Sequence, residues 1–441
     1  MSANYEPVIG LEVHVELNTK SKMFCRCSAD YFGREPNTHT CPVCLGLPGA
    51  LPVINQEAID KCIQIGLALN CSVNPQSYFE RKNYFYPDLA KGFQTSQLVK
   101  PIAVKGWIMV DDGKGREMKI RINRAHQEED TGKLTHVGGE TLIDYNRSSV
   151  PLTEIVTEPD FNDSSQIRDY AKKLQQIFRY LGVSNADMER GDMRLEANIS
   201  VRKVGQKELP PYRVELKNIN SFRFMVAAVE YEIKRQIEAH EKGEKLFQET
   251  RGWNEEKRET YLQRSKEDAH DYRYFPEPDL PELQITNDKV QIIKVKIPEL
   301  PVVKTKRYQK EFGIPKQTAS QLAESNRLAL FFEKAINYGE KKGIDPKQIA
   351  NFIINNPMEI LADTFEQIVD DLVAKQSSMI TDDTQLQGWA KEAINEDLDA
   401  VKKYKSGKTG VIMALVGAVM KKSAGKANAG KVKEILEKLL K

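Results

Sequence analysis

The strongest constraint on the fold of this chain is a change of pattern near residue 296 of its 441 residues. Before that point, runs such as "EANISVR" and "RVELKNI" have the composition of β-strands and alternate with Gly, Pro and Asn turns and a few helical stretches. After it, strand patterns nearly vanish, and stretches such as "TFEQIVDDLVAKQ" have the period of amphipathic helices. The chain also exceeds the usual size of one hydrophobic core. The pattern predicts an α+β protein: a large mixed N-terminal domain followed by all-helical domains.

The prolines of "KIPELPVVKTKRYQKEFGIP" indicate a linker between these parts, because this stretch shows no clear period. The expected segments are a mixed domain at residues 1–296, the linker with a helical domain at 297–383, and a Lys-rich helical tail at 384–441. From residue 401 to the end there are eleven Lys and two Glu, a net charge of +9, against +2 for the whole chain. Such a charge on a folded unit is typical either of a solvated surface or of contact with nucleic-acid phosphates.

Two local elements are predicted with particular features. The stretch "SSQIRDYAKKLQQIFRYLG" should form a helix with a Ser cap and a terminating Gly182. The stretch "VQIIKVKI" is rich in β-branched residues and is predicted to form a strand.

The chain start, "MSANYEPVIG", has neither the basic nor the apolar region of a secretory signal. The longest apolar run, "VIMALVGAVM", is too short to span a bilayer. The sequence therefore predicts a cytoplasmic protein without a membrane partner.

Four of the six cysteines lie close together, as Cys25-x-Cys27 and, after thirteen residues, Cys41-x-x-Cys44. Two short spacings let two tight turns supply two thiolates each to a tetrahedral Zn²⁺. Four thiolates fill the coordination shell, so the site would be structural, and His39 is close enough in sequence to replace one cysteine. The alternative is a reduced loop without metal.

The stretch "IGLEVHVEL" alternates apolar residues with Glu12, His14 and Glu16. Successive side chains of a strand point to opposite faces, so these three would share one side. They could form the wet face of a half-buried strand or part of a polar site.

Similar clusters of acid, amide and basic residues occur in "RAHQEEDTGK", "GDMRLEANISVR", "YRVELKNINSF" and "ERKNYFYPD". Neither a phosphate-binding loop of the G-x-x-x-x-G-K-[ST] type nor a G-x-G-x-x-G or G-x-S-x-G motif is present. Each cluster alone could be a solvated edge. Together their oxygen ligands suit Mg²⁺, and their Lys and Arg residues could hold phosphates.

Several long motifs resemble, in order along the chain, the signatures of the B subunits (GatB) of the bacterial aspartyl/glutamyl-tRNA amidotransferases. They are "VIGLEVHVEL", "RKNYFYPD", "HQEEDTGK", "NRSSVPLTEIVTEPD", "EANISVR", "ELKNINSF", "DYRYFPEPDLP" and the tail "YKSGKTGVIMALVGAVMKKSAGKANAGKV". The resemblance implies a cradle-like catalytic domain in a heterotrimer with an amidase (GatA) and a small third protein (GatC). In that complex, the amidase would release ammonia from glutamine, and GatB would use ATP to phosphorylate the side-chain carboxylate of Glu-tRNA(Gln), Asp-tRNA(Asn) or both. Ammonia arriving through a channel would then displace the phosphate.

The resemblance also implies roles for individual residues. The expected Mg²⁺ ligands are Glu12, His14, Glu128, Glu129 and Glu215. His14, Lys82 and Glu129 would be catalytic, the last two where ammonia enters beside Tyr84, and Glu16 would be the most expendable acid of its row. The expected contacts to ATP phosphates or to the carboxylate are Arg147, Arg194, Asn198 and Lys217. The four cysteines would hold structural Zn²⁺.

The sequence departs from the family pattern in two places that bear on these expected roles. Ser149 stands where the family usually has glycine, and the region before the tail is shorter than usual. Two other functions fit the same residues: an RNA-binding zinc module without catalysis, and a free-standing ATP-dependent carboxylate ligase that acts on small molecules.

Overall fold

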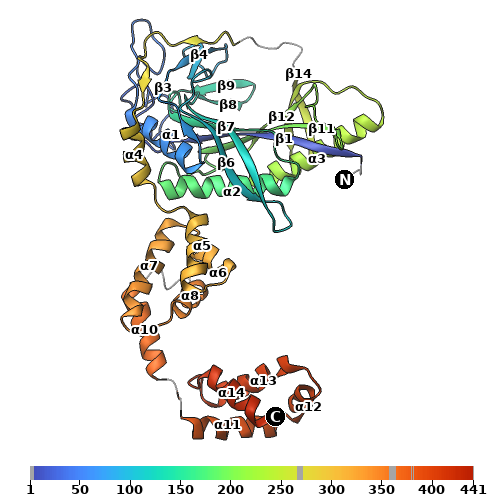
Figure 1. The fold of residues 1–441 in the computed structure, drawn as a ribbon. Coiled ribbons are helices and arrows are strands. Elements are labelled where there is room, and N and C mark those ends of the chain that lie inside the picture. The colour runs from blue at the N-terminus through green and yellow to red at the C-terminus, as the bar shows by residue number, and fades with distance from the viewer. Residues whose placement is uncertain (1–3, 266–271, 357–363, 379, 381, 441) are drawn as a thin grey trace. The chain divides into compact units, whose positions relative to one another are not determined.

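The computed structural model describes residues 4–265, 272–356, 364–378, 380 and 382–440. The chain forms two compact units, Met1–Lys304 and Thr305–Lys441. The first unit combines a large sheet with helices, and the described part of the second is helical apart from one isolated bridge at Ile380 (Figure 1). The predicted α+β class with helical C-terminal domains is confirmed.

A nine-stranded sheet forms the centre of the first unit. Its strands, in spatial order, are β14 Glu259–Ser265, β13 Glu249–Asn254, β12 Val214–Ile219, β11 Met193–Lys203, β1 Tyr5–Glu16, β10 Pro151–Thr157, β7 Glu117–Glu129, β6 Ala103–Asp111 and β2 Ser72–Val73. Neighbours are antiparallel except β12 and β13, which are parallel. The N-terminal strand β1 therefore lies in the middle of the sheet, between β10 and β11.

Three helices cover the apolar face of this sheet (Figure 1): α1 Gln56–Ala68, α2 Ser164–Leu181 and α3 Phe222–Glu241. Helix α2 ends at Gly182 in the left-handed conformation, as predicted, but its cap is Asp163 rather than a serine. The Asp163 carboxylate accepts a hydrogen bond from the backbone N–H of Ser165, and Gln166 closes a capping box. Because the helices cover one face only, the polar side chains of β1 lie on the other.

Short strands add three small sheets to the first unit. They are β4 Glu80–Asn83, β5 Phe93–Ser96 and β15 Phe275–Pro276 in one, β3 Gln76–Ser77 and β16 Leu283–Gln284 in the second, and β8 Lys133–Val137 and β9 Glu140–Asp144 in the third. Strand β5 contacts β7, so the β15-β4-β5 sheet lies against the large sheet near the end of β7.

The strand predicted for "VQIIKVKI" is wrong, because these residues belong mostly to helix α4, Asn287–Lys296. The Thr286 side chain caps the helix by accepting a hydrogen bond from the backbone N–H of Lys289. The helix also packs on α1. Capping and packing here override the β-branched composition.

The linker predicted around Pro301 is largely helical, since α5 runs over Pro301–Phe312. A proline is tolerated in the first helical turn, where its missing N–H has no partner to lose. Over the described residues, the remaining helices are α6 Lys316–Leu322, α7 Asn326–Glu340, α8 Pro346–Asn355, α10 Phe365–Ser377, α11 Asp383–Glu396, α12 Leu398–Lys405, η1 Thr409–Val411, α13 Ile412–Lys422 and α14 Ala429–Leu440. One hydrophobic core joins α5, α6, α7, α8 and α10, and another joins α11, α12, α13 and α14.

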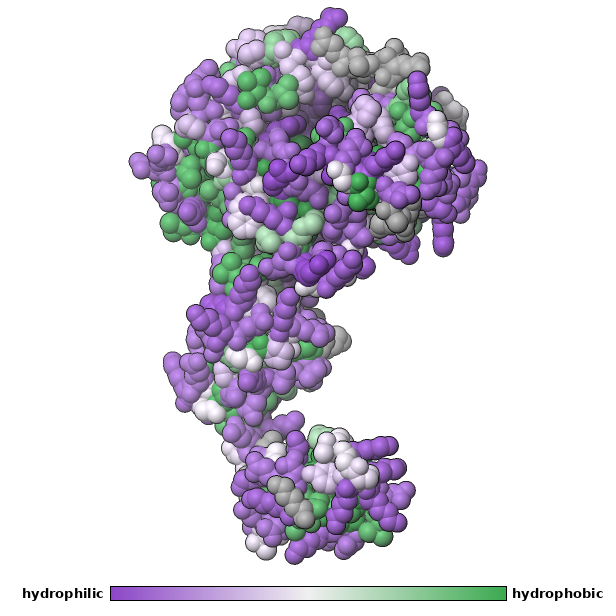
Figure 2. Space-filling model, turned by 45° about the vertical axis from the view of Figure 1, so that its right-hand side comes forward, coloured by the Kyte–Doolittle hydropathy of each residue, from purple (hydrophilic) through white to green (hydrophobic). Residues whose placement is uncertain are grey.

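Among the described residues, no helix is long and apolar enough to cross a membrane. Hydrophilic residues predominate on the face of each part shown in Figure 2, with apolar residues scattered between them.

Candidate functional site

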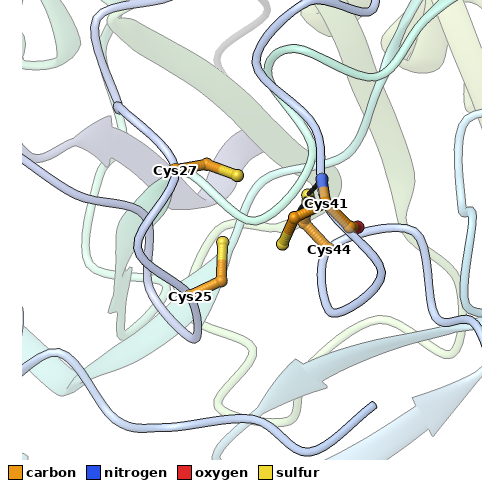
Figure 3. A group of neighbouring side chains, drawn as sticks. All are labelled: Cys25, Cys27, Cys41 and Cys44. Atoms are coloured by element: carbon orange, nitrogen blue, oxygen red, sulfur yellow. Dashed lines mark hydrogen bonds between the residues drawn. The ribbon is translucent and has the colours of Figure 1, made fainter. Parts of the chain in front are cut away.

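The four predicted zinc ligands lie together in two loops (Figure 3). The sulfur atoms of Cys25, Cys27, Cys41 and Cys44 all lie within 4.8 Å of one another. The edge of a tetrahedron of sulfurs around Zn²⁺ is about 3.8 Å, from a Zn–S distance of about 2.3 Å. These four cysteines, called here the thiol group, could therefore hold a metal ion, and His39 is not part of the cluster.

A buried lysine accompanies the thiol group. The Nζ atom of Lys22, a residue with 0% exposure, lies 3.7 Å from the Sγ atom of Cys44. A hydrogen bond from Cys25 lowers the pKa of the Cys44 thiol to about 5 against the effect of burial, and the charge of Lys22 contributes. The surroundings of Cys44 thus favour its thiolate, the form that binds metals, whereas a hydrogen bond with Cys44 and burial raise the pKa of Cys25, and burial raises that of Cys27.

The polar side chains of β1 share one face, as predicted, but their neighbours differ. In the antiparallel pairing, His14 lies opposite Glu154 of β10, and Glu12 lies opposite Glu196 of β11. Opposite residues in such pairs point to the same side. The row on β1 is therefore divided between two acidic groups.

The first group, called here the His14 group, consists of His14, Glu128 and Glu154, whose ligand atoms lie within 4.8 Å of one another. The two carboxylates are buried, and the Nε2 atom of His126 lies 3.2 Å from an oxygen of each. Burial raises the pKa of Glu154, but the charges of His126 and His14 lower it well below its usual value. His126 therefore holds two buried carboxylates together in their charged form.

Lys82 on β4 faces the His14 group. Burial would lower the pKa of its ammonium group, but Glu128 and Glu154, with Tyr274, raise it above the usual value. The Nζ atom lies 5.3 Å from the centroid of the Tyr272 ring and 5.9 Å from that of Tyr84. Protonated Lys82 thus lies near two carboxylates and two tyrosine rings.

The second group, called here the Glu12 group, consists of Glu12, Glu196 and Glu215, again within 4.8 Å of one another. The Nζ atom of Lys217 lies 2.8 Å from Glu196 and 3.2 Å from Glu215. The Asn198 side chain donates a hydrogen bond of 2.9 Å to Glu12. Burial, together with the charges of Glu154 and Glu196, raises the pKa of Glu12. The Glu12 group is thus balanced by Lys217, which reaches two of its carboxylates, whereas His126 lies between the two carboxylates of the His14 group.

The Glu12 group borders a cavity of about 460 Å³. Among its lining residues are Gly10, Glu12, Asn198 and Arg213. A ligand of moderate size in this cavity could therefore reach Glu12 and the Asn198 side chain that donates to it.

Glu16 belongs to neither group. It is buried beside Asp130, and the Tyr31 hydroxyl donates a hydrogen bond of 3.0 Å to its carboxyl group. Burial and Asp130 raise the pKa of Glu16 well above its usual value, whereas the charges of Arg147 and Arg194 lower that of Asp130 despite its burial. The two arginines predicted to contact phosphate thus support an internal pair of acids.

The structure does not bring the five predicted Mg²⁺ ligands into one cluster. Glu129 forms an ion pair with Lys91 and accepts a hydrogen bond of 2.9 Å from the backbone N–H of Thr95. Adjacent residues of a strand point to opposite faces, so Glu128 joins the His14 group and Glu129 points away from it.

Ser149 has a φ of +69°, in the left-handed region that favours glycine. Its backbone N–H donates to the carbonyl of Asp130, and its buried Oγ atom has no hydrogen-bond partner among the described residues. The serine at the family's glycine position therefore keeps a backbone conformation suited to glycine.

His126 and Glu196 lie in the polar clusters predicted from the sequence but received no individual role there, and Glu154 lies outside those clusters. Glu196 alternates with Arg194 and Asn198, and Glu154 lies within the alternating run "PLTEIVTE". This period was a usable signal for polar residues on one face, but it does not say which strands are neighbours.

Comparisons with known proteins cover nearly the whole chain. Residues 7–291 match the family described as the GatB/GatE catalytic domain, and residues 332–440 match the GatB domain. The chain is 44% identical over 491 aligned positions to the B subunit of the aspartyl/glutamyl-tRNA(Asn/Gln) amidotransferase of Dehalococcoides mccartyi (strain CBDB1), covering 99% of each sequence. The identity to the protein of the same name from Persephonella marina is 43% over 482 positions, covering 99% of this chain and 100% of that one. For Thermotoga maritima it is 42% over 488 positions, covering 99% of each.

Proposed function

Because the chain belongs to the family of aspartyl/glutamyl-tRNA amidotransferase B subunits, we propose that it activates the side-chain carboxylate of a misacylated tRNA for amidation. The substrates would be Glu-tRNA(Gln), Asp-tRNA(Asn) or both. The observation that carries the proposal is the pair of acidic groups on one face of the sheet, with Lys82 beside one and a cavity beside the other.

The proposed chemistry has two steps. A carboxylate oxygen forms a bond to the γ-phosphorus of ATP while the bond from that phosphorus to the β-γ bridging oxygen breaks, and ADP leaves with the electron pair. The lone pair of ammonia then attacks the carbonyl carbon of the acyl phosphate, inorganic phosphate leaves, and the nitrogen loses a proton to give the amide. The first step is needed because a carboxylate oxygen is a poor leaving group.

Both acidic groups fit Mg²⁺, which prefers oxygen ligands and accepts only a few from the protein. The His14 group would hold one ion through His14, Glu128 and Glu154, and the Glu12 group a second through Glu12, Glu196 and Glu215. Bound Mg²⁺ would neutralise charge on the phosphate oxygens. His126 and Lys217 would keep the carboxylates ionised and in place.

The remaining predicted residues receive roles from their neighbours. Lys82 and Glu129 stay our predictions for the residues that meet incoming ammonia beside Tyr84, Lys82 through a buried ammonium group and Glu129 through its ion pair with Lys91. Asn198 and Lys217 would orient the Glu12 group, and Arg147 and Arg194 would hold the buried acid Asp130 in place beside Glu16.

The thiol group would hold one structural Zn²⁺, because four ligands leave no open position for a reactant. The ion would stabilise two loops, and Lys22 would offset part of the charge of the four thiolates.

We assign catalysis to residues 1–296, and tRNA contact to the Lys-rich tail at 384–441, with the helical segment 297–383 between them. Ammonia would come from the amidase GatA in a heterotrimer that also contains the small protein GatC. The sequence contains no G-x-S-x-G nucleophile motif, which agrees with glutamine hydrolysis in a partner.

The test is reconstitution with candidate GatA and GatC proteins, followed by amidation of both misacylated tRNAs. We expect Gln-tRNA or Asn-tRNA to form only with glutamine, ATP and Mg²⁺, and ADP to form in step with the amide. Truncation before residue 384 should weaken tRNA binding and reduce its salt dependence.

The two other functions give different results in this test. An RNA-binding module would bind tRNA without ADP formation. A free-standing ligase would consume ATP with a small carboxylic acid and without the partner proteins. Either result would overturn the proposed function.

A further inference from the structure

Several cations on the polar face of the sheet already have acceptors within the protein. They are Arg147, which donates to the carbonyls of Thr131 and Gly132 at 3.0 and 2.9 Å, Arg194, which pairs with Asp130, and Lys217, which pairs with Glu196 and Glu215. These side chains have few donors left for a ligand.

Arg124 on β7 is different. Its Nε atom is buried and has no hydrogen-bond partner, and its guanidinium group forms no ion pair with any residue in the described ranges. An arginine in such a setting leaves a costly group unsatisfied in the free protein. Its donors are thus available to a ligand.

Arg124 lies on the face of the sheet that carries both acidic groups. It lies two residues before His126, on the same side of β7, and opposite Val156 of β10, which is itself opposite Glu12 of β1. Residues two apart on a strand are about 7 Å apart, and neighbouring strands about 5 Å. Arg124 therefore lies about one such step from His126 and about two strands from Glu12.

Tyr274 lies close enough to Arg124 for the charge of the arginine to affect its pKa. Burial raises the pKa of Tyr274 to about 12, against the charges of Lys82 and Arg124, while Glu128 and Glu154 act in the same direction as burial. Tyr274 thus lies near Arg124, the buried Lys82 and the carboxylates of the His14 group.

We propose that Arg124 is a substrate-contacting residue that binds an oxyanion of the reacting groups, either the γ-phosphoryl group of ATP or the carboxylate that receives it. A guanidinium group offers parallel N–H donors that match phosphate and carboxylate oxygens. The nearby carboxylates form no ion pair with Arg124 in the described part of the chain, so its charge remains for an anion that arrives with the substrates. The inference rests on the proposed function, since it assumes phosphoryl transfer at this face.

The experiment compares Arg124→Gln, Arg124→Lys and Arg124→Ala in the reconstituted complex. We expect Arg124→Gln to lower kcat for amide and ADP formation by about 10²–10³-fold, as for loss of a charged donor in an active site. Arg124→Lys should keep only part of the wild-type kcat, because an ammonium group lacks the parallel N–H donors of a guanidinium group. Methylguanidinium added to Arg124→Ala should restore part of the rate, which loss of a merely structural residue would not allow.

The matched control is Arg121→Gln. Arg121 lies on the same strand three residues earlier, is exposed, and is ion-paired with Asp160. We expect this variant to keep the wild-type rate.

The outcomes distinguish a phosphoryl group from a carboxylate as the bound oxyanion, and the role of Arg124 from the proposed function as a whole. A higher KM for ATP assigns the oxyanion to the phosphoryl group, and a higher KM for aminoacyl-tRNA assigns it to the carboxylate. Wild-type rates in Arg124→Gln, or lost activity with lowered thermal stability and no rescue, would overturn the role of Arg124. Absence of ATP-dependent amidation in the wild-type complex would instead overturn the proposed function.

Discussion

The His14 group and the Glu12 group are made of the same kinds of residues on the same face of one sheet, but they differ in how their charge is balanced. In the His14 group two buried carboxylates share the Nε2 atom of His126, at 3.2 Å from each. In the Glu12 group the three carboxylates are less deeply buried, and Lys217 reaches two of them. The first group is fixed by the protein, whereas the second needs a further cation for balance.

This difference has consequences for binding. A preorganised group loses little conformational entropy when a cation binds, and its geometry changes little. In the Glu12 group Lys217 already pairs with two of the three carboxylates, so a metal cation has to compete with an ammonium group for them. We therefore expect the His14 group to bind Mg²⁺ tightly and the Glu12 group to bind it weakly, so that occupancy of the second group depends on Mg²⁺ concentration.

The largest effect should come from Glu154→Gln in the His14 group. The change keeps the size of the side chain but removes a charge that balances His126 and that would bind Mg²⁺. We expect amidation to fall by about 10³-fold, roughly 4 kcal/mol of transition-state stabilisation. The tRNA amidation assay at saturating ATP and Mg²⁺ measures it, with thermal unfolding as the control for folding. A rate near wild type would show that this group is only a polar part of the sheet.

The thiol group provides a closed site for comparison with these two open ones. Cys41→Ser should lower the stability of the first unit by several kcal/mol, because zinc binding supplies folding energy. Elemental analysis of the reduced wild-type protein should find one zinc per chain, and the variant should lose it. If the wild-type protein contains no stoichiometric zinc, the group is a reduced loop without metal.

Cross-strand pairing explains how much of these sites the sequence could predict. The alternation in "IGLEVHVEL" correctly predicted that Glu12 and His14 lie on one face of the strand. The spacing of the cysteines correctly predicted that four thiols lie together. The family resemblance is also confirmed. The separation of Glu12 from His14 could not be predicted, because it depends on which strands flank β1.

Local features account for the other differences. Neighbouring Glu128 and Glu129 could have been separated by strand geometry alone, since adjacent residues face opposite ways. The helix at Asn287–Lys296 could not be separated from a strand by composition, because its cap and its contact with α1 decide it. Burial of His126 between two carboxylates is likewise a product of packing.

A smaller, conditional effect is expected for Glu196→Gln in the Glu12 group. If this group binds a cation weakly, the variant should need more Mg²⁺ to reach its maximal rate, with a loss of about 10-fold at limiting Mg²⁺, or about 1.4 kcal/mol. Added Mg²⁺ should recover most of the rate. A titration of amidation rate against Mg²⁺ for this variant and for Glu154→Gln checks the contrast. If added Mg²⁺ rescues both variants equally, the two groups do not differ in affinity.

The smallest effect should come from Glu16→Gln, on the same row of β1 but outside both groups. Burial and the nearby Asp130 raise the pKa of Glu16 well above its usual value, so its carboxyl group holds a proton that the unfolded chain would have released. The folded state therefore binds more protons between the usual and the raised pKa, and wild-type stability falls as the pH rises through that window. Glutamine has nearly the same shape as a protonated glutamate and does not titrate. We expect its amidation rate to stay near wild type and its free energy of unfolding to change by less than about 1 kcal/mol, with a weaker loss of stability toward high pH. Denaturant unfolding across this pH range measures the difference. A loss of amidation as large as that of Glu154→Gln would mean that the row on β1 acts as one site, and that its division between two groups has no functional meaning.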